Sequence, residues 1–320
     1  MSNFYNNKNV LVTGGTGFTG INLIKRLVNL GANVTATIHN KFPVILDTRI
    51  RHVKVDLMDR KDCLSVCESQ DFVFMCAANT SGAAVMEKTP LAHVTPNVVM
   101  NTLMLDAAYV CSVKKFLFLS STTVYPLSDM ALIESDVTGE LFDKYYCVGS
   151  MKLFSETLCN MYATKIKNPM TTIIVRPGNL YGDYDDFEWE TSHSTAALIR
   201  RVVERHSPIT VWGDGSDIKD ITYISDFIDG LILSMEKIDK FDIINIAGGK
   251  SHSIKETLEM MLKVDNYQDA KIIYDSTKPV MIPKRYIDIS KAQYLLGFNP
   301  KISLEEGLRK TIQWYRENKK

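Results

Sequence analysis

The feature that most constrains this chain is a glycine-rich segment near its amino terminus. The stretch LVTGGTGFTG carries Gly14, Gly17 and Gly20 in a G-x-x-G-x-x-G spacing. A short apolar strand, Val10 to Thr13, leads into it, and apolar residues at helical spacing follow from Gly20 to Leu30. Glycine lets a backbone turn sharply and approach a ligand, and a helix amino terminus attracts anions. The pattern predicts a strand–turn–helix unit that holds the two phosphates of a dinucleotide.

Short β-branched runs alternate with helical stretches through the first half of the chain. The predicted strands are Val10–Thr13, Asn33–Ile38, His52–Leu57, Phe72–Ala77, Lys115–Ser120 and Thr171–Arg176. The predicted helices are Gly20–Leu30, Asn97–Cys111 and Ser150–Lys165. Such alternation is typical of parallel β-α-β units with helices on both faces of the sheet. We therefore predict an α/β fold with a Rossmann-type, doubly wound parallel sheet.

The rhythm of strands and helices breaks after Pro177. A loop rich in Tyr, Gly, Asp, Glu and Trp is followed by a predicted helix, Ser194–Arg205, and a predicted strand, Asp220–Ile224. These elements are too few for a second Rossmann unit. We predict a dinucleotide-binding domain over residues 1–177 and a smaller, mixed α/β substrate lobe over residues 178–320. The chain is expected to cross back to the first domain near residues 220–247.

Charge and composition narrow the possible partners and location. Lys plus Arg and Asp plus Glu both number 37, so no broad positive field attracts nucleic acid or anionic lipid. The six cysteines form no C-x-x-C pair, and we find no metal-ligand spacing. The amino terminus is polar, and no apolar run reaches the ~18 residues that a membrane span needs. We expect a cytoplasmic protein with reduced thiols, whose anionic ligands are held by local cations.

The end of the second strand normally selects the cofactor. An acid there binds the adenosine ribose of NAD, whereas basic groups suit the 2′-phosphate of NADP. This chain has no acid at that point and reads Thr37-Ile38-His39-Asn40-Lys41. We predict NAD without excluding NADP. Asp56, after the third strand, is a candidate acceptor for the adenine amine.

Five segments in order resemble the extended short-chain dehydrogenase/reductase family, also called the NAD-dependent epimerase/dehydratase family. They are TGGTGFTG, CAANTSG around Ala77 and Ala78, LFLSSTTVYP, RPGNLYGD from Arg176, and the tail from Asp288. The resemblance covers nearly the whole chain. It implies a cofactor site made of Gly14, Gly17, Phe18, Thr19, Gly20, His39, Asp56, Leu57, Ala77, Ala78 and Lys152.

Within that family the chain is most similar to GDP-fucose synthases and related GDP-sugar oxidoreductases. SHSTAALIRR resembles the start of their His-containing helix, and VWGDGSDIKD resembles their guanosine-diphosphate site. The resemblance implies a GDP-linked sugar substrate. It places Arg201 and Lys219 at the diphosphate with Trp212 nearby, Asn179 as a hydrogen-bond partner, and Arg285 at the phosphates or distal nucleotide.

The family's chemistry uses a serine, a tyrosine and a lysine four residues after the tyrosine. The serine polarises the sugar oxygen, the tyrosine transfers a proton, and the lysine lowers the tyrosine pKa and holds the nicotinamide ribose. Ser121 matches the serine, with Ser120 and Thr122 as alternatives of register, and Lys152 matches the lysine. The tyrosine position is Val148.

Three explanations remain open for the missing phenol. A local bulge could bring Tyr146 to the site, another group such as His193 could move the proton, or catalysis could be weak or absent. An imidazole titrates near neutral pH, which suits His193 to proton transfer.

A second departure bears on the type of reaction. GDP-fucose synthases use a cysteine for epimerisation, and Thr123 stands at that position. A threonine hydroxyl is too weak an acid and base for that step. The prediction is therefore hydride transfer at C4 of a GDP-linked hexose or heptose, in surface-polysaccharide biosynthesis, as in GDP-heptose 4-dehydrogenases. The alternatives are a 3,5-epimerase-reductase and a silent dinucleotide sensor. The resemblance also implies a homodimer, with the helices Asn97–Cys111 and Ser150–Lys165 forming a four-helix bundle.

Overall fold

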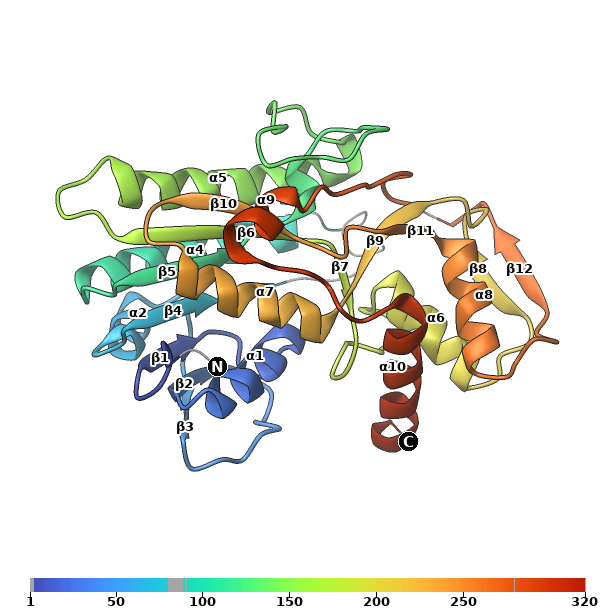
Figure 1. Ribbon diagram of the computed structural model, residues 1–320, viewed down its shortest axis with the longest axis horizontal. Helices are drawn as coiled ribbons and strands as arrows, with labels where there is room; N and C mark the ends of the chain where they lie inside the picture. Colours follow the sequence, from blue (N-terminus) through green and yellow to red (C-terminus); the bar gives the residue numbers. More distant parts are fainter. Residues whose placement is uncertain (1–2, 80–88, 90, 279, 320) are drawn as a thin grey trace.

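A seven-stranded parallel sheet organises the first lobe of the computed structural model, which describes residues 3–79, 89, 91–278 and 280–319 (Figure 1). The strands are β1 (Asn9–Val12), β2 (Asn33–Ile38), β3 (Ile50–Lys54), β4 (Phe72–Met75), β5 (Lys115–Leu119), β6 (Thr171–Pro177) and β10 (Asp242–Ile246). Their order is β10-β6-β5-β4-β1-β2-β3, and every neighbouring pair is parallel. The connections reverse direction between β1 and β4, which is where doubly wound sheets bind ligands. The predicted Rossmann-type fold is confirmed.

Helices cover both faces of this sheet. One face carries α2 (Arg60–Cys67), α4 (Leu91–Val110) and α5 (Tyr146–Thr164), and the other carries α1 (Phe18–Asn29), α7 (Ile224–Lys237) and α9 (Ser290–Leu296). Two hydrophobic cores result, one on each side of the sheet. Strand β4 is buried along its whole length, as expected for a central strand covered on both faces.

The second lobe mixes short sheets with three helices. Strands β7 (Asn179–Tyr181), β9 (Ile218–Tyr223) and β11 (Ser251–Ser253) form one small sheet, and β8 (Ile209–Trp212) pairs with β12 (Ile272–Asp275). Helices α6 (Ser194–Val203), α8 (Ile254–Val264) and α10 (Leu304–Asn318) pack together beside them. Between β9 and β11 the chain returns to the first lobe, because β10 pairs with β6 and α7 packs against α1.

Two long helices begin earlier than the sequence pattern predicts. Helix α4 starts at Leu91 rather than Asn97, even though it contains Pro96. Proline removes the N–H that would bond to the carbonyl of Ala92, and the side-chain amide of Asn79 donates to that carbonyl instead, at 3.0 Å. Tertiary contacts therefore extend the helix past a residue that normally interrupts it.

The early start of α5 bears directly on function. This helix begins at Tyr146, not Ser150, so Val148 and Lys152 both lie within regular helix. Residues four apart share one face of a helix. A three-residue 3-10 turn, η2 (Asp143–Tyr145), leads into it.

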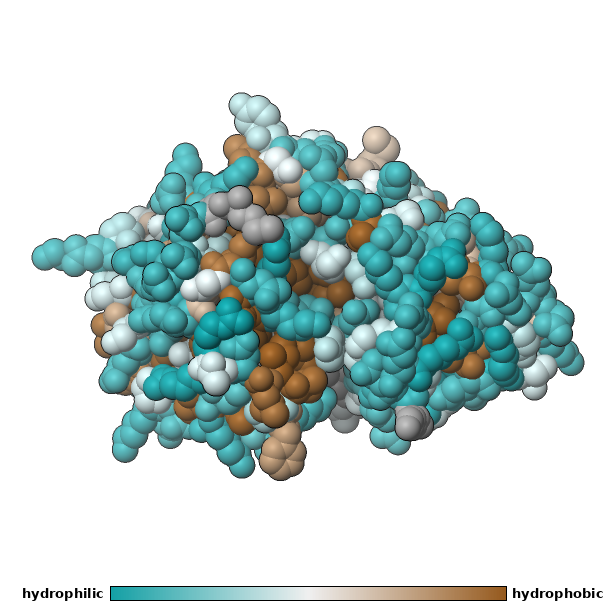
Figure 2. Space-filling view, turned by 60° about the horizontal axis from the view of Figure 1, so that its bottom comes forward, coloured by the Kyte–Doolittle hydropathy of each residue, from teal (hydrophilic) through white to brown (hydrophobic). Residues whose placement is uncertain are grey.

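The face of the molecule drawn in Figure 2 combines a hydrophilic periphery with an apolar middle. In the space-filling view, brown residues gather toward the centre of the molecule and teal residues dominate its edges (Figure 2). No helix in the described part of the chain is both long and apolar enough to cross a bilayer.

Candidate active site

The glycine turn between β1 and α1 is held by two threonines. Gly14 has a φ of 68°, and a Cβ there would lie 2.9 Å from the Cα of Ala77. Its N–H donates to the Thr37 hydroxyl at 3.0 Å. The Thr13 hydroxyl accepts from the N–H groups of Cys76 and Ala77, each at 3.0 Å. The turn is thereby fixed to β2 and β4, a role for Thr13 and Thr37 that the glycine pattern alone did not reveal.

The amino terminus of α1 fits a diphosphate. Gly17 is its N-cap, and no side chain caps the helix. Uncapped N–H groups and the positive end of the helix dipole can therefore serve an anionic ligand. A Cβ on Gly20 would collide with the Gly14 carbonyl oxygen, so the helix can lie this close to the turn only with glycine there. These features match what a dinucleotide pyrophosphate needs.

The remaining predicted cofactor residues also lie at the carboxyl edge of the sheet. Phe18 and Thr19 open α1, and His39 follows β2 with an exposed side chain. Asp56 is exposed after β3, and one of its carboxylate oxygens accepts from the N–H of Met58 at 2.9 Å. Leu57 is buried beside it, and Ala77 and Ala78 follow β4. The end of the CAANTSG segment, residues 80–82, lies outside the described residues.

The hydroxyl residues after β5 occupy distinct environments. Ser121 caps the 3-10 turn η1 (Thr122–Val124), where its oxygen accepts from the N–H of Thr123 at 3.1 Å. Its hydroxyl hydrogen is left for another acceptor. Ser120 is buried and donates to Glu156. This difference favours Ser121 over Ser120 as the residue that faces a ligand. The Thr123 hydroxyl oxygen is buried without a hydrogen-bond partner.

Lys152 reaches from α5 to the end of β5. Its Nζ donates to the Leu119 carbonyl at 2.8 Å, and the side chain is buried over the Phe118 ring. Burial lowers the pKa of this ammonium to about 8, and the charge of Glu156 opposes that shift only in part.

The position of the family tyrosine is held by a regular helical turn. Val148 is half-buried one turn before Lys152 on the same face of α5. Tyr146 is 62% exposed at the first residue of the helix. No bulge brings its phenol to Lys152, so the first of the three explanations is not supported.

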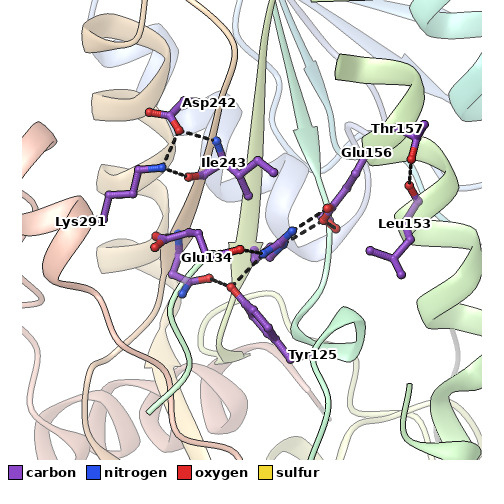
Figure 3. Close-up of polar contacts among 11 residues, drawn as sticks. Tyr125, Glu134, Leu153, Glu156, Thr157, Asp242, Ile243 and Lys291 are labelled. Carbon is purple, nitrogen blue, oxygen red and sulfur yellow. Dashed lines mark hydrogen bonds and ion pairs between the residues drawn. The ribbon is translucent and has the colours of Figure 1, made fainter. Parts of the chain in front are cut away.

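A buried polar network lies behind these residues (Figure 3). Arg176 of β6 forms a bidentate ion pair with Glu156, with distances of 3.0 Å and 2.7 Å. The same guanidinium donates to the Tyr125 hydroxyl, which in turn donates to Asn245 at 2.7 Å. The backbone N–H of Asn245 donates to the Glu134 carboxylate. The network joins α5 to three segments of chain and fixes the backbone on which Ser121 and Lys152 lie.

A second cluster forms where the two lobes meet. Arg285 is buried and donates to the Pro126 carbonyl at 3.0 Å. Burial lowers its pKa to about 10, because the nearby phenols of Tyr145 and Tyr125 compensate only partly. The Lys219 ammonium donates to the Ile282 carbonyl and lies 3.5 Å from the Asp217 carboxylate.

The structure therefore brings Lys219 and Arg285 together. It adds Asp217 and Tyr145, which the sequence analysis did not predict as site residues. Burial lowers the pKa of Lys219, Asp217 opposes this shift, and the charge of Arg285 adds to it. Burial raises the pKa of the Tyr145 phenol, with Arg285 opposing that shift and Asp217 adding to it. Tyr145 lies directly before the first residue of α5, and this position could have marked it as a candidate. Because the helix was predicted to begin at Ser150, the position was not recognised.

The predicted residues of α6 interact with a different set of side chains. His193 is the N-cap of α6, exposed but crowded by protein atoms that lower its pKa, with Asp186 opposing the shift. The Arg201 guanidinium lies 5.4 Å from the Trp189 ring centre, and Arg200 lies over the same indole at 4.1 Å. Asn179 and Trp212 are both exposed, on β7 and β8.

These observations define a class. A parallel sheet with a glycine turn at its switch point, and a serine and lysine at its carboxyl edge, belongs to dinucleotide-dependent enzymes of the Rossmann type. The family model for the NAD-dependent epimerase/dehydratase family matches residues 10–247. The chain belongs to this family, which confirms the predicted family and NAD as the cofactor.

Individual relatives narrow the comparison. The chain is 31% identical over 97% of its length to a probable GDP-L-fucose synthase 1 of Oryza sativa subsp. japonica, covering 92% of that protein. It is 28% identical over 96% of its length to a GDP-mannose 3,5-epimerase 1 of Oryza sativa subsp. indica, covering 82% of it. Among solved structures, a UDP-glucuronic acid 4-epimerase from Bacillus cereus, in complex with UDP-glucuronic acid and NAD, superposes with a TM-score of 0.83. It is 27% identical, and the match covers 97% of this chain and 99% of that one.

Proposed function

We propose that this protein is an NAD(P)-dependent oxidoreductase that transfers a hydride between the nicotinamide and C4 of a GDP-linked hexose or heptose. The proposal includes a role in the synthesis of surface-polysaccharide sugars, based on the resemblance to GDP-sugar oxidoreductases, and a location in the cytoplasm. The observation that carries the proposal is the combination of the glycine turn and uncapped amino terminus of α1 with the side chains of Ser121 and Lys152 at the same edge of the sheet.

The choice of a GDP-linked sugar rests on sequence relatives and on charge. Relatives that match nearly the whole chain are named for GDP-sugars. The cluster at the lobe junction offers Arg285, a buried cation whose pKa is lowered to about 10 and whose hydrogen bonds go to neutral carbonyls. A diphosphate would supply the negative charge that this guanidinium lacks. Arg201 is a further cation at the same lobe, with Trp212, Asn179 and Lys219 as the other expected contacts.

Redox chemistry at C4 is favoured over epimerisation by Thr123. Removing a proton from carbon beside a ketone requires a group that is both acidic and basic near neutral pH, and an alcohol is neither. The Thr123 hydroxyl is buried beside the predicted catalytic serine. It can donate a hydrogen bond to a sugar oxygen, which positions the ring without altering its stereochemistry.

The roles of the chain's residues follow from their positions. The glycine turn and the amino terminus of α1 would hold the pyrophosphate, Asp56 the adenine, and Lys152 the nicotinamide ribose. A bound nicotinamide supplies or accepts the hydride. Ser121 polarises the C4 oxygen with the hydroxyl hydrogen that it does not use in capping. His193, whose pKa is lowered, is the proton-transfer candidate from sequence.

The test is hydride transfer followed by nicotinamide absorbance. Purified protein would be mixed with NAD, NADP or their reduced forms, and with GDP-mannose-type or GDP-heptose sugars, using the matching UDP-sugars as controls. We expect turnover with at least one GDP-sugar and less with its UDP counterpart. Turnover in deuterated water that places deuterium at C3 or C5 would instead indicate an epimerase-reductase. Dinucleotide binding without turnover of any sugar would indicate a sensor.

The same proposal includes a homodimer built on α4 and α5. Phe154 and Met161 lie seven residues apart on α5 and are each 46% exposed. Such spacing places both on one helical face. Large exposed apolar side chains along one face are typical of a helix that packs against another subunit.

A further inference from the structure

We propose that Lys152, beyond holding the cofactor ribose, is itself the acid and base that exchanges a proton with the C4 oxygen of the sugar. This inference rests on the proposed function, and it answers which group replaces the phenol. Four observations carry it: the place of Val148, the burial of Nζ, the occupation of Glu156 by other partners, and the unused hydroxyl of Ser121.

The first observation concerns the face of α5 that points to the end of β5. An isopropyl group at Val148 occupies the position one turn before Lys152, and it can neither donate nor accept a proton. Tyr146 is exposed, and the phenol of Tyr145 lies among Arg285, Asp217 and Ile282. Among the described residues of this helical turn, Lys152 is therefore the titratable group that reaches the strand end.

The second and third observations concern charge. The Lys152 side chain is 8% exposed, and its hydrogen bond goes to a neutral carbonyl, that of Leu119. The acid whose charge acts on Lys152 is Glu156, and both of its oxygens accept from Arg176 (Figure 3). One of these oxygens also accepts from the Ser120 hydroxyl. The positive charge of Arg176 therefore offsets much of the stabilisation that Glu156 gives to the Lys152 ammonium.

Among the residues that the structure describes, the other elements packed around Lys152 add little charge. Strand β5 offers the Phe118 ring and the Leu119 carbonyl. Helix α4 offers the neutral amide of Asn101, bonded to Ser155 at 3.0 Å. The Tyr125 phenol after η1 is held neutral, with its pKa raised to about 12. An ammonium in such surroundings loses its proton more easily than a lysine in water, and the pKa of about 8 agrees with this.

The fourth observation concerns how close Lys152 and Ser121 lie along β5 and the residues that follow it. The carbonyl that holds Nζ belongs to Leu119, two residues before Ser121, and the Ser121 hydroxyl hydrogen is not used in capping. In the reductive direction the carbonyl carbon gains hydride with its electron pair, and the oxygen takes the negative charge. An O–H bond then forms on the sugar as an N–H bond of Lys152 breaks. Neutral Nζ keeps the electron pair and recovers a proton from water.

The sign of the pH dependence follows. Reduction needs the ammonium, so its rate is constant at low pH and falls as pH rises through about 8. Oxidation needs the neutral amine, so its rate rises through the same range. A family enzyme with a catalytic phenol loses reductive activity only when its phenol loses the proton.

The decisive experiment combines a titration with two matched pairs of variants. Nitrogen-15 NMR of the lysine side chains in the full chain, without cofactor, should show one ammonium titrating near pH 8 that disappears in Lys152→Met and persists in Lys165→Met. Lys165 is exposed at the carboxyl end of the same helix. Lys152→Arg keeps a positive charge but cannot release its proton, so we expect a loss of activity of about 10²-fold or more and no limb near pH 8.

The second pair restores or withholds the phenol at Val148. Val148→Tyr should raise the rate about 10-fold or more and move the pH limb, whereas Val148→Phe adds the ring without the hydroxyl and should do neither. A pH limb that moves in His193→Asn would assign the proton transfer to that imidazole and overturn the inference. The inference is overturned if Lys152 titrates near 10.5 or if Lys152→Arg keeps full activity with the wild-type limb. Absence of turnover in the wild type overturns the proposed function and this inference with it, while a titration near 10.5 in an active enzyme overturns the inference alone.

Discussion

At the scale of single residues, the Arg176–Glu156 pair has the largest predicted effect on stability. Both side chains are almost fully buried, and the guanidinium serves Tyr125 as well. Glu156→Gln would leave a buried cation without its counter-charge, which costs about 3–5 kcal/mol. We expect urea denaturation to show a loss of that size. Glu306→Gln, in the exposed pair with Lys310, should change the free energy of unfolding by less than about 0.5 kcal/mol. Equal effects of the two substitutions would refute this view of the network.

Asp185 is predicted to make the stability of the protein depend on pH. Its carboxyl is buried, and burial raises its pKa to about 7, although the N–H of Asp186 donates to it. The folded chain therefore holds a proton that the unfolded chain releases near pH 4. Stability from this group is complete below about pH 4 and is lost as pH rises to about 7. Asp185→Asn should remove that loss, so that above pH 7 the variant is more stable by at least about 1 kcal/mol. Parallel stability curves for the variant and the wild type between pH 4 and 8 would contradict the assignment.

At the scale of elements, the β1–α1 turn depends on close backbone contact as well as on dihedral angles. Gly14→Ala places a Cβ at a φ of 68° and 2.9 Å from the Ala77 Cα. We expect a loss of about 1–2 kcal/mol in stability and at least a 10-fold loss in dinucleotide affinity, measured by calorimetry. Gly139→Ala is the matched control, because Gly139 also has a positive φ, of 87°, but open space around its Cβ. If both variants bind the dinucleotide equally well, close approach at Gly14 does not matter.

At the scale of the whole molecule, the exposed apolar face of α5 predicts self-association. Phe154→Glu combined with Met161→Glu should convert a dimer to a monomer in sedimentation analysis, because like charges would then meet across the two-fold axis. Dinucleotide affinity should change little, since both residues are exposed on α5. A double variant that sediments as the wild type does would place the interface elsewhere.

Local patterns in the sequence determined much of this protein. The Asn33–Ile38 strand has the predicted bounds, and the glycine spacing correctly predicted the turn between β1 and α1. Both signals, hydrophobic periodicity and the absence of side chains, act over a few residues. The family motifs also predict Ser121 and Lys152 as site residues, with Val148 at the position of the family tyrosine. These inferences need no knowledge of distant contacts.

Only the tertiary structure decided which distant residues these side chains contact. Helix α4 passes through Pro96 because Asn79, from another segment, bonds to the carbonyl that proline leaves free. Arg176 of β6 forms an ion pair with both oxygens of Glu156, so this carboxylate offsets only part of the effect of burial on the pKa of Lys152. Tyr145 joins Arg285, a residue far along the chain, at the junction of the lobes. Charge pairing and burial depend on which distant segments the fold brings within a few ångströms, and no local pattern encodes those distances.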